Sequence, residues 1–300
     1  MTEVMFIDPG PAGATPERKS ILARLRHYPA GVAGGVTLLL LVAGGLLLPV
    51  IGPYDPAAQV SLPLLAPSAA HWFGTDELGR DILTRVVAGA PVTLATAIGA
   101  ALIAAGIGAP LGILAGYLGG WVDSILARFT DFVLSIPGIL LALVIVALLG
   151  ANLANLTLAI GIGAFPAFTR LARASTLTIR ERAFVQAARS MGASSLDIMV
   201  RTVAPNVFSP LMVQVIITAS VAVLVAASLS FLGLGAPPPA PSWGGMLQVS
   251  RAYVYDAPLY GVFPGLALMI TVASFDAIGR SLMRATGTKS VGGITKAGAH

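Results

Sequence analysis

Residues 86–122 contain no charged side chain, and this uninterrupted stretch limits what the chain can fold into. A helix needs about 20 apolar residues to cross the hydrocarbon core of a bilayer, and the stretch exceeds that length. The composition agrees, because 56% of the residues are hydrophobic and 10% are charged. A soluble domain usually carries about 25% charged residues. We therefore predict an all-α integral membrane protein.

Six segments are apolar enough to be transmembrane helices. They are residues 31–52, 91–117, 132–149, 156–169, 208–232 and 259–278. The fourth segment is the shortest and contains Pro166. A helix that is apolar on all sides shows no stripe, so periodicity does not orient these segments.

The stretch 86–122 could form one long helix or a hairpin, and the distribution of basic residues favours one helix. With six spans and an inner N-terminus, the outer segments hold only Arg80, Arg85 and Arg251 of the 18 basic residues. A hairpin would move the basic block 170–201 outside, which the positive-inside rule opposes. Both termini are therefore expected in the cytoplasm. The net charge of +5 is attributed to this topology and not to nucleic-acid binding.

These assignments divide the chain into five regions. They are an N-terminal cytoplasmic arm (1–30), a first transmembrane helix (31–52), an extracytoplasmic segment (53–90), a core with five transmembrane helices (91–280) and a cytoplasmic tail (281–300). Within the core, residues 180–205 form a long inner loop.

The inner loop has the pattern of a helix, a turn and a second helix. Apolar and small residues of the first helix recur at helical spacing on one face, and they are Phe184, Ala187, Ala188 and Met191. Gly192 suits the left-handed position that ends a helix. Ser194 or Ser195 can cap the second helix, whose apolar face holds Leu196, Met199 and Val200. Pro205 is expected to close the unit. On its shape alone, the loop could equally be an amphipathic segment lying on the inner leaflet.

The spacing of this loop resembles the EAA loop of ABC-importer permeases. In that loop E-A-A is followed by three residues, a glycine, nine residues and I-x-L-P. Here Gln186, Ala187, Ala188, Gly192 and Pro205 occupy these positions, with Gln186 in place of the glutamate. The resemblance implies that the loop docks on an ATPase through a coupling helix, with Phe184, Met191, Ala193 and Leu196 also in the contact.

The chain itself offers no chemistry of its own. It contains no G-x-x-x-x-G-K-[ST] phosphate loop and no cysteine. Its three histidines, His27, His71 and His300, lie far apart in the sequence and are expected at the surface or an interface. No cofactor is expected to bind this chain, and ATP and Mg²⁺ would be used by partner ATPase subunits.

The outer segment 71–85 is unusually charged. It contains the run F-G-T-D-E-L-G-R-D-I-L-T-R, which resembles the corresponding segment of the "C" member of the dipeptide and oligopeptide permease subfamily. One interpretation is a solvated interfacial helix capped by Thr75. The other is an outer gate, in which charged residues pair across a subunit interface. The candidates for that gate are Asp76, Arg80, Asp81 and Arg85.

A third block, residues 227–247, contains S-F-L-G-L-G, a proline cluster and W-G-G-M-L, and it resembles the same subfamily. Trp243 suits the level of the lipid headgroups, and Ser242 can cap a short helix. The resemblance covers roughly residues 71–278. It implies the type I ABC-importer permease architecture in the bacterial inner membrane.

The resemblance also implies partners. They are a homologous second permease subunit, two ATPase subunits and an extracytoplasmic solute-binding protein. A secondary transporter or channel with an amphipathic loop is the alternative. Such a carrier usually places ionisable residues inside its spans, and the interiors of the six segments contain none. The substrate class expected from the resemblance is peptides or similar small solutes.

Overall fold

The computed structural model of the chain describes residues 27–286, and all regular elements within this range are helices. In chain order they are α2 (Pro29–Ile51), α3 (Ile82–Leu118), α4 (Gly120–Leu134), α5 (Gly138–Leu149), α6 (Leu153–Arg180), α7 (Ala183–Ser190), α8 (Ser195–Asp197), η1 (Ile198–Val203), α9 (Ala204–Phe231), α10 (Trp243–Ser250), η2 (Arg251–Tyr253) and α11 (Leu259–Thr286). The all-α prediction is confirmed for this range. The expected arm 1–30 and tail 281–300 lie largely outside it.

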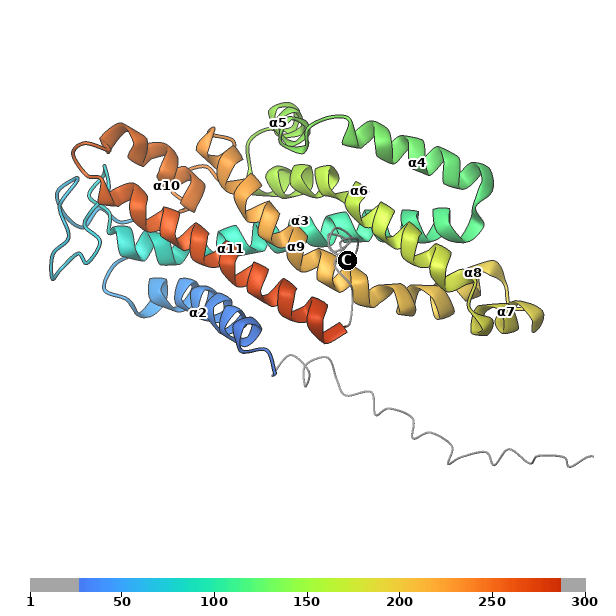
Figure 1. Cartoon of the computed structure of the whole chain (residues 1–300). Helices are drawn as coiled ribbons and strands as arrows, with labels where there is room; N and C mark the ends of the chain where they lie inside the picture. The colour runs from blue at the N-terminus through green and yellow to red at the C-terminus, as the bar shows by residue number, and fades with distance from the viewer. Residues whose placement is uncertain (1–26, 287–300) are drawn as a thin grey trace, which may run out of the picture.

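The long helices form one elongated bundle (Figure 1). α3, α9 and α11 run along its length, and α2 lies beside them. The short helix α10 and the irregular segment before α3 lie at one end, and α7 and α8 lie at the other. The bundle therefore has two distinct ends, and each carries one of the motif-rich segments.

Among residues 27–286, four helical stretches are long and apolar enough to cross a membrane. They are Pro29–Ile51, Ile82–Leu118, Ser195–Phe231 and Leu259–Thr286. The pair Gly120–Leu134 and Gly138–Leu149 makes a fifth if the two helices count as one broken span. The expected segment 156–169 lies in α6, which is outside this set and carries Arg170 and Arg173 in its C-terminal half.

The uncharged stretch forms one helix, as the charge distribution predicted, and not a hairpin. α3 has 37 residues and contains Pro91 and Pro110 without a break. It begins at Ile82, because the Asp81 carboxylate accepts a hydrogen bond from the Thr84 N–H at 2.8 Å. This is the usual device for satisfying a free N–H group at a helix start.

The expected span at 132–149 is not a single helix. The chain bends by 84° between α4 and α5. Pro137 lies in the bend and has no N–H group to donate. A proline also disfavours the helical conformation of the residue before it, here Ile136.

Glycines allow α3 and α6 to approach closely. Gly108, Gly112 and Gly116 lie on one face of α3, and a Cβ atom at Gly112 would lie only 2.3 Å from the Thr169 carbonyl oxygen of α6. Small residues at this spacing bring helix backbones together in membranes, where dispersion contacts replace the hydrophobic effect as the driving force. This contact holds the two ends of the molecule in a fixed relation.

Candidate functional site

The unit formed by α7, α8 and η1 has the local geometry that its sequence predicted. Gly192 has a φ of 84° and follows α7 in the left-handed conformation. The Ser194 hydroxyl accepts a hydrogen bond from the Asp197 N–H at 3.2 Å and caps α8. Both predictions are confirmed, because each depends on only a few neighbouring residues.

One side of this unit is anchored in the bundle. Val185, Ile198 and Val203 are fully or almost fully buried, and they belong to a cluster with Tyr117 of α3 and Phe168 of α6. The π-helical turn η1 continues directly into α9, so Ser195–Phe231 is one continuous helical stretch. The unit is therefore rigidly joined to three long helices.

Two arginines add polar links to α3. The Arg189 guanidinium lies over the Tyr117 ring, 5.7 Å from its centroid. The Arg180 Nη1 donates to the Gly116 carbonyl oxygen at 2.9 Å. A guanidinium over an aromatic face is attracted by the ring quadrupole, which orients α7 on the end of α3.

The other side of the unit exposes apolar side chains. The exposed fractions are 47% for Phe184, 81% for Met191, 67% for Leu196 and 59% for Val200. Ala187 and Gln186 are also exposed, and Ala188 and Ala193 are half-buried. The sequence predicted this apolar face but missed Val185, which is the residue of α7 that packs inward.

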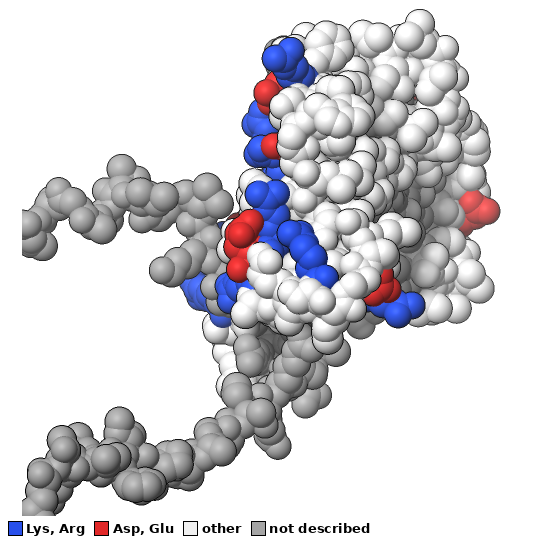
Figure 2. Space-filling model, turned by 90° about the vertical axis from the view of Figure 1, so that its right-hand side faces the viewer, with Lys and Arg blue, Asp and Glu red and all other residues white. Residues whose placement is uncertain are grey.

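Pro205 does not close the unit as expected. It is exposed and lies in the first turn of α9, where the helical stretch continues from η1. In the view onto this end of the molecule, charged side chains gather along one side and most of the remaining visible surface is uncharged (Figure 2). Arg182, Arg189 and Arg201 are exposed in the same segment as the apolar face, a combination that is usual for protein–protein contacts.

At the opposite end, the expected solvated helix at 75–85 is wrong. Residues 71–81 form turns, and Thr75 caps no helix. Asp76, Arg80, Asp81 and Arg85 are all at most 6% exposed. Charges are buried in proteins only when they are paired.

The partners of these charges lie in the same chain. Arg80 Nε lies 2.6 Å from Asp76 Oδ2, and Arg80 Nη2 lies 2.7 Å from Glu77 Oε1. Arg85 Nε lies 3.2 Å from the same Asp76 oxygen, and its Nη1 donates to the Pro56 carbonyl oxygen at 2.8 Å.

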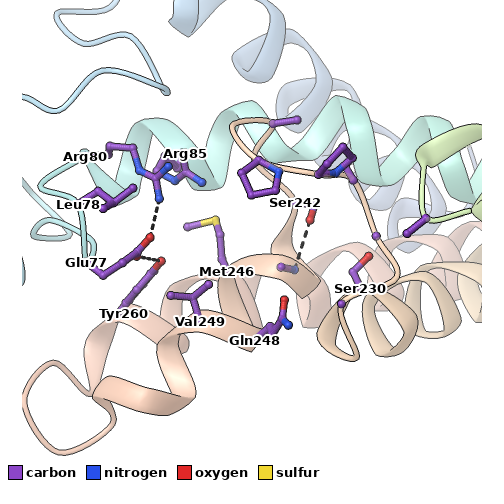
Figure 3. Close-up of a pocket in the computed structure, with 18 residues that line it drawn as sticks. Glu77, Leu78, Arg80, Arg85, Ser230, Ser242, Met246, Gln248, Val249 and Tyr260 are labelled. Atoms are coloured by element: carbon purple, nitrogen blue, oxygen red, sulfur yellow. Dashed lines mark hydrogen bonds and ion pairs between the residues drawn. The ribbon is translucent and has the colours of Figure 1, made fainter.

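Two residues that the sequence did not single out complete the outer cluster. The Tyr260 hydroxyl of α11 donates to Glu77 Oε2 at 2.6 Å, so Glu77 lies between Arg80 and Tyr260 (Figure 3). His71 Nδ1 lies 3.0 Å from Asp81 Oδ2, and His71 is 6% exposed, so its expected surface position is wrong. Glu77 and Tyr260 are 183 positions apart, and no local pattern signals such a pair.

Trp243, for which the sequence suggested a position at the level of the lipid headgroups, is fully buried within the chain. Its ring lies beside Gly89 of α3, and its indole N–H donates to the Val86 carbonyl oxygen at 2.7 Å. The predicted cap of α10 is confirmed, because the Ser242 hydroxyl accepts from the Gly245 N–H at 3.3 Å. These contacts hold α10 against the start of α3, next to the buried charges.

The chain is thus a multi-span helical bundle with an exposed apolar face at one end and a buried charge cluster at the other, as expected for a membrane protein with distinct functional ends. The chain belongs to the family described as binding-protein-dependent transport system inner membrane component, whose model matches residues 108–288. It is thus a multi-pass inner membrane protein and the permease subunit of a binding-protein-dependent ABC importer, and not itself an ATPase. The family assignment removes the alternatives of a secondary transporter or a channel.

Similar proteins support this family assignment. The chain is 42% identical over 271 residues to the glutathione transport system permease protein GsiD of Shigella flexneri serotype 5b, covering 90% of this chain and 89% of the relative. It is 41% identical over the same length to GsiD of Escherichia coli O6:K15:H31, with the same coverage. A chain of the MetNI methionine ABC transporter in an inward-facing conformation has a similar fold, with a TM-score of 0.55 and 20% identity over 68% of this chain and 97% of that chain.

Proposed function

We propose that this chain is one of two homologous permease subunits of an importer for peptides or similar small solutes, driven by two ATPase subunits. The substrate class is supported by the relatives, whose names assign them to glutathione transport, and glutathione is itself a small peptide. A solute-binding protein outside the membrane would deliver the solute.

The observation that carries the coupling proposal is the two-sided character of the α7–η1 unit. Val185 and Ile198 are buried on one side, whereas Met191 and Leu196 are 81% and 67% exposed on the other. An exposed apolar patch bordered by charge marks a docking surface. A unit that is rigidly joined to α3, α6 and α9 would carry movement of the ATPase to these helices.

The topology of this proposal has six spans, with both termini in the cytoplasm. α6 is the additional span that completes the set of six, because it has 28 residues and packs along α3 through the glycine face. A helix of that length is about 42 Å long at 1.5 Å per residue, enough to cross the hydrocarbon core and reach α7.

The outer cluster of Asp76, Glu77, Arg80, Asp81 and Arg85 forms part of the outer gate in this proposal. Its ion pairs, together with Trp243, connect the start of α3 to α10 and α11. In this proposal the gate depends on charged side chains that hold the outer ends of the helices together within one subunit.

The Met191→Glu variant tests the coupling proposal. The exposed thioether should tolerate the change in the isolated chain, but a carboxylate in the docking surface would be desolvated without a partner. We expect the purified variant complex to retain much less ATPase subunit and to lose ATP-dependent uptake.

Tyr255→Glu is the matched control, because Tyr255 is 96% exposed at the opposite end of the molecule. It should retain the ATPase subunits at the level of the unmodified chain. Full retention and full uptake by Met191→Glu would refute the docking role of α7.

A further inference from the structure

A pocket opens beside the outer cluster, between the start of α3, the loop 233–240, α10 and the start of α11. It encloses about 290 Å³, close to the lower end of the range for small-molecule sites, about 300–1,000 Å³. Its charged and polar lining includes Glu77, Arg80, Arg85, Gln248 and Tyr260 (Figure 3).

The acidic groups of this cluster are already hydrogen-bonded within the chain. Glu77 accepts one hydrogen bond at each carboxylate oxygen, from Arg80 and from Tyr260. Asp76 is 0% exposed, and it accepts from the Leu78 and Arg80 N–H groups at Oδ1 and from Arg80 Nε at Oδ2. The carboxylates are thus occupied by the protein itself.

The arginines, in contrast, have donors to spare. Arg85 is 6% exposed, and within residues 27–286 its only side-chain hydrogen bond is the one to the Pro56 carbonyl oxygen. Its Nε is close to Asp76 but makes no hydrogen bond, although the atom is buried. A guanidinium has more N–H groups than these bonds use, and unmatched buried donors are costly.

We infer that this outer pocket binds a carboxylate of the transported solute through the N–H groups of Arg80 and Arg85. Planar guanidinium groups bind carboxylates in a two-pronged geometry. Most of the remaining lining is small or apolar and includes Gly235, Ala236, Pro237, Met246 and Val249, while Ser230, Ser242 and Gln248 are its polar members (Figure 3). Such a wall accepts the remainder of a peptide-like solute without selecting its side chains, so the carboxylate is the recognised feature. The inference rests on the proposed import of peptides.

The absence of cysteine from the chain allows a direct test. In the complete transporter, Gln248→Cys places a thiol in the pocket wall, and Tyr255→Cys places one at an exposed position outside it. The rate of alkylation by neutral N-ethylmaleimide is followed on this chain by mass spectrometry. The probes are N-acetylglycylglycine and its C-terminal amide, which differ only in the carboxylate.

We expect the acid to slow alkylation of the thiol at position 248 about tenfold at roughly ten times its Kd, since shielding grows as 1 + [L]/Kd. The amide should have no effect at the same concentration, and the thiol at position 255 should react equally fast under all conditions. Adding Leu78→Glu should abolish the protection, because a fixed carboxylate at the pocket rim competes for the same donors, whereas Leu78→Gln should preserve it.

Four results would overturn the inference. Equal protection by acid and amide would remove the role of the carboxylate, and equal protection by sodium chloride would indicate an adventitious ion only. Protection by the solute-binding protein without solute would assign the pocket to that protein. If the thiol at position 248 fails to react in the complex while the thiol at position 255 reacts, a partner subunit covers the pocket.

This readout does not depend on the ATPase subunits. If Met191→Glu keeps the ATPase subunits and uptake while the acid protects the thiol at position 248 as expected, only the coupling proposal is refuted. If Met191→Glu loses ATPase retention and uptake as expected but the acid does not protect the thiol at position 248, only the pocket inference is refuted.

Discussion

Asp76 is the residue on which the outer cluster depends. It is fully buried, and its two oxygens face the backbone and side-chain N–H groups of Arg80 and the guanidinium of Arg85. Removal of one partner from a buried ion pair leaves the opposite charge uncompensated. A single oxygen-to-nitrogen replacement therefore affects both arginines at once.

We predict that Asp76→Asn lowers the stability of the purified transporter by about 3–5 kcal/mol. If the cluster belongs to the outer gate, basal ATPase activity without solute should rise as well. Thermal unfolding and basal ATP hydrolysis measure the two effects. Asp55→Asn is the matched control, because Asp55 lies in an exposed turn and its side chain accepts from the Ala57 N–H. Equal thermal stability of the two variants would contradict the role of Asp76.

Gly192 is a second position where one residue sets the local geometry. Its φ of 84° costs an L-residue about 1–2 kcal/mol, and a β-branched residue is the least suited to it. The space around it is open, so the cost is in the backbone alone.

We predict that Gly192→Val reduces uptake and ATPase retention, because the turn between α7 and α8 would change direction. Gly192→Asn should keep both, since asparagine adopts the left-handed conformation more readily. The measurement is uptake into proteoliposomes at equal amounts of permease. If Gly192→Val and Gly192→Asn support the same uptake, the angle between α7 and α8 does not matter for transport.

At the scale of elements, the contact between α3 and α6 dominates the bundle. A Cβ atom at Gly108 or Gly112 would approach a carbonyl oxygen of α6 to 2.3 Å. Backbone atoms cannot move aside as a flexible side chain does, so a larger residue must separate the helices. The same contact joins the α7–η1 unit to the core, because α6 leads directly into α7.

We predict that Gly112→Val destabilises the chain by at least about 1–3 kcal/mol, the usual cost of overpacking. Gly106→Val on the same helix is the matched control, because no atom lies within 4 Å of its added Cβ. Thermal unfolding in detergent compares the two variants. Similar midpoints would mean that α3 and α6 can separate without cost.

At the scale of the whole molecule, the proposed topology places the two ends of the bundle on opposite sides of the membrane. In the proposed topology the basic residues of α6, α7 and η1 place the α7–η1 unit in the cytoplasm, following the positive-inside rule. The outer cluster would then lie on the extracytoplasmic side.

We predict that a thiol introduced by Ser194→Cys is not labelled in intact cells by a membrane-impermeant maleimide, whereas one introduced by Tyr255→Cys is. The chain has no other cysteine to react. Permeabilised cells provide the control, because neither position is buried in the structure and both should then react. Labelling at position 194 from outside would invert the topology and remove the docking proposal.

The sequence alone determined the features that depend on local residues or on composition. The membrane class, the single long α3, the left-handed Gly192 and a serine cap at position 194 or 195 follow from transfer energies and from backbone preferences over a few residues. These terms are summed along the chain, so they can be evaluated without knowing which helices meet.

Only the tertiary structure decided which side of each helix is covered. The sequence could not show that Val185 packs inward, that Trp243 is buried or that Tyr260 donates to Glu77, because each contact joins residues that are far apart in the chain. The glycine face of α3 had a readable signal in its four-residue spacing, but its partner α6 did not. The break at Pro137 likewise became visible only in the folded chain, because proline inside a membrane helix is compatible with both a straight and a broken span.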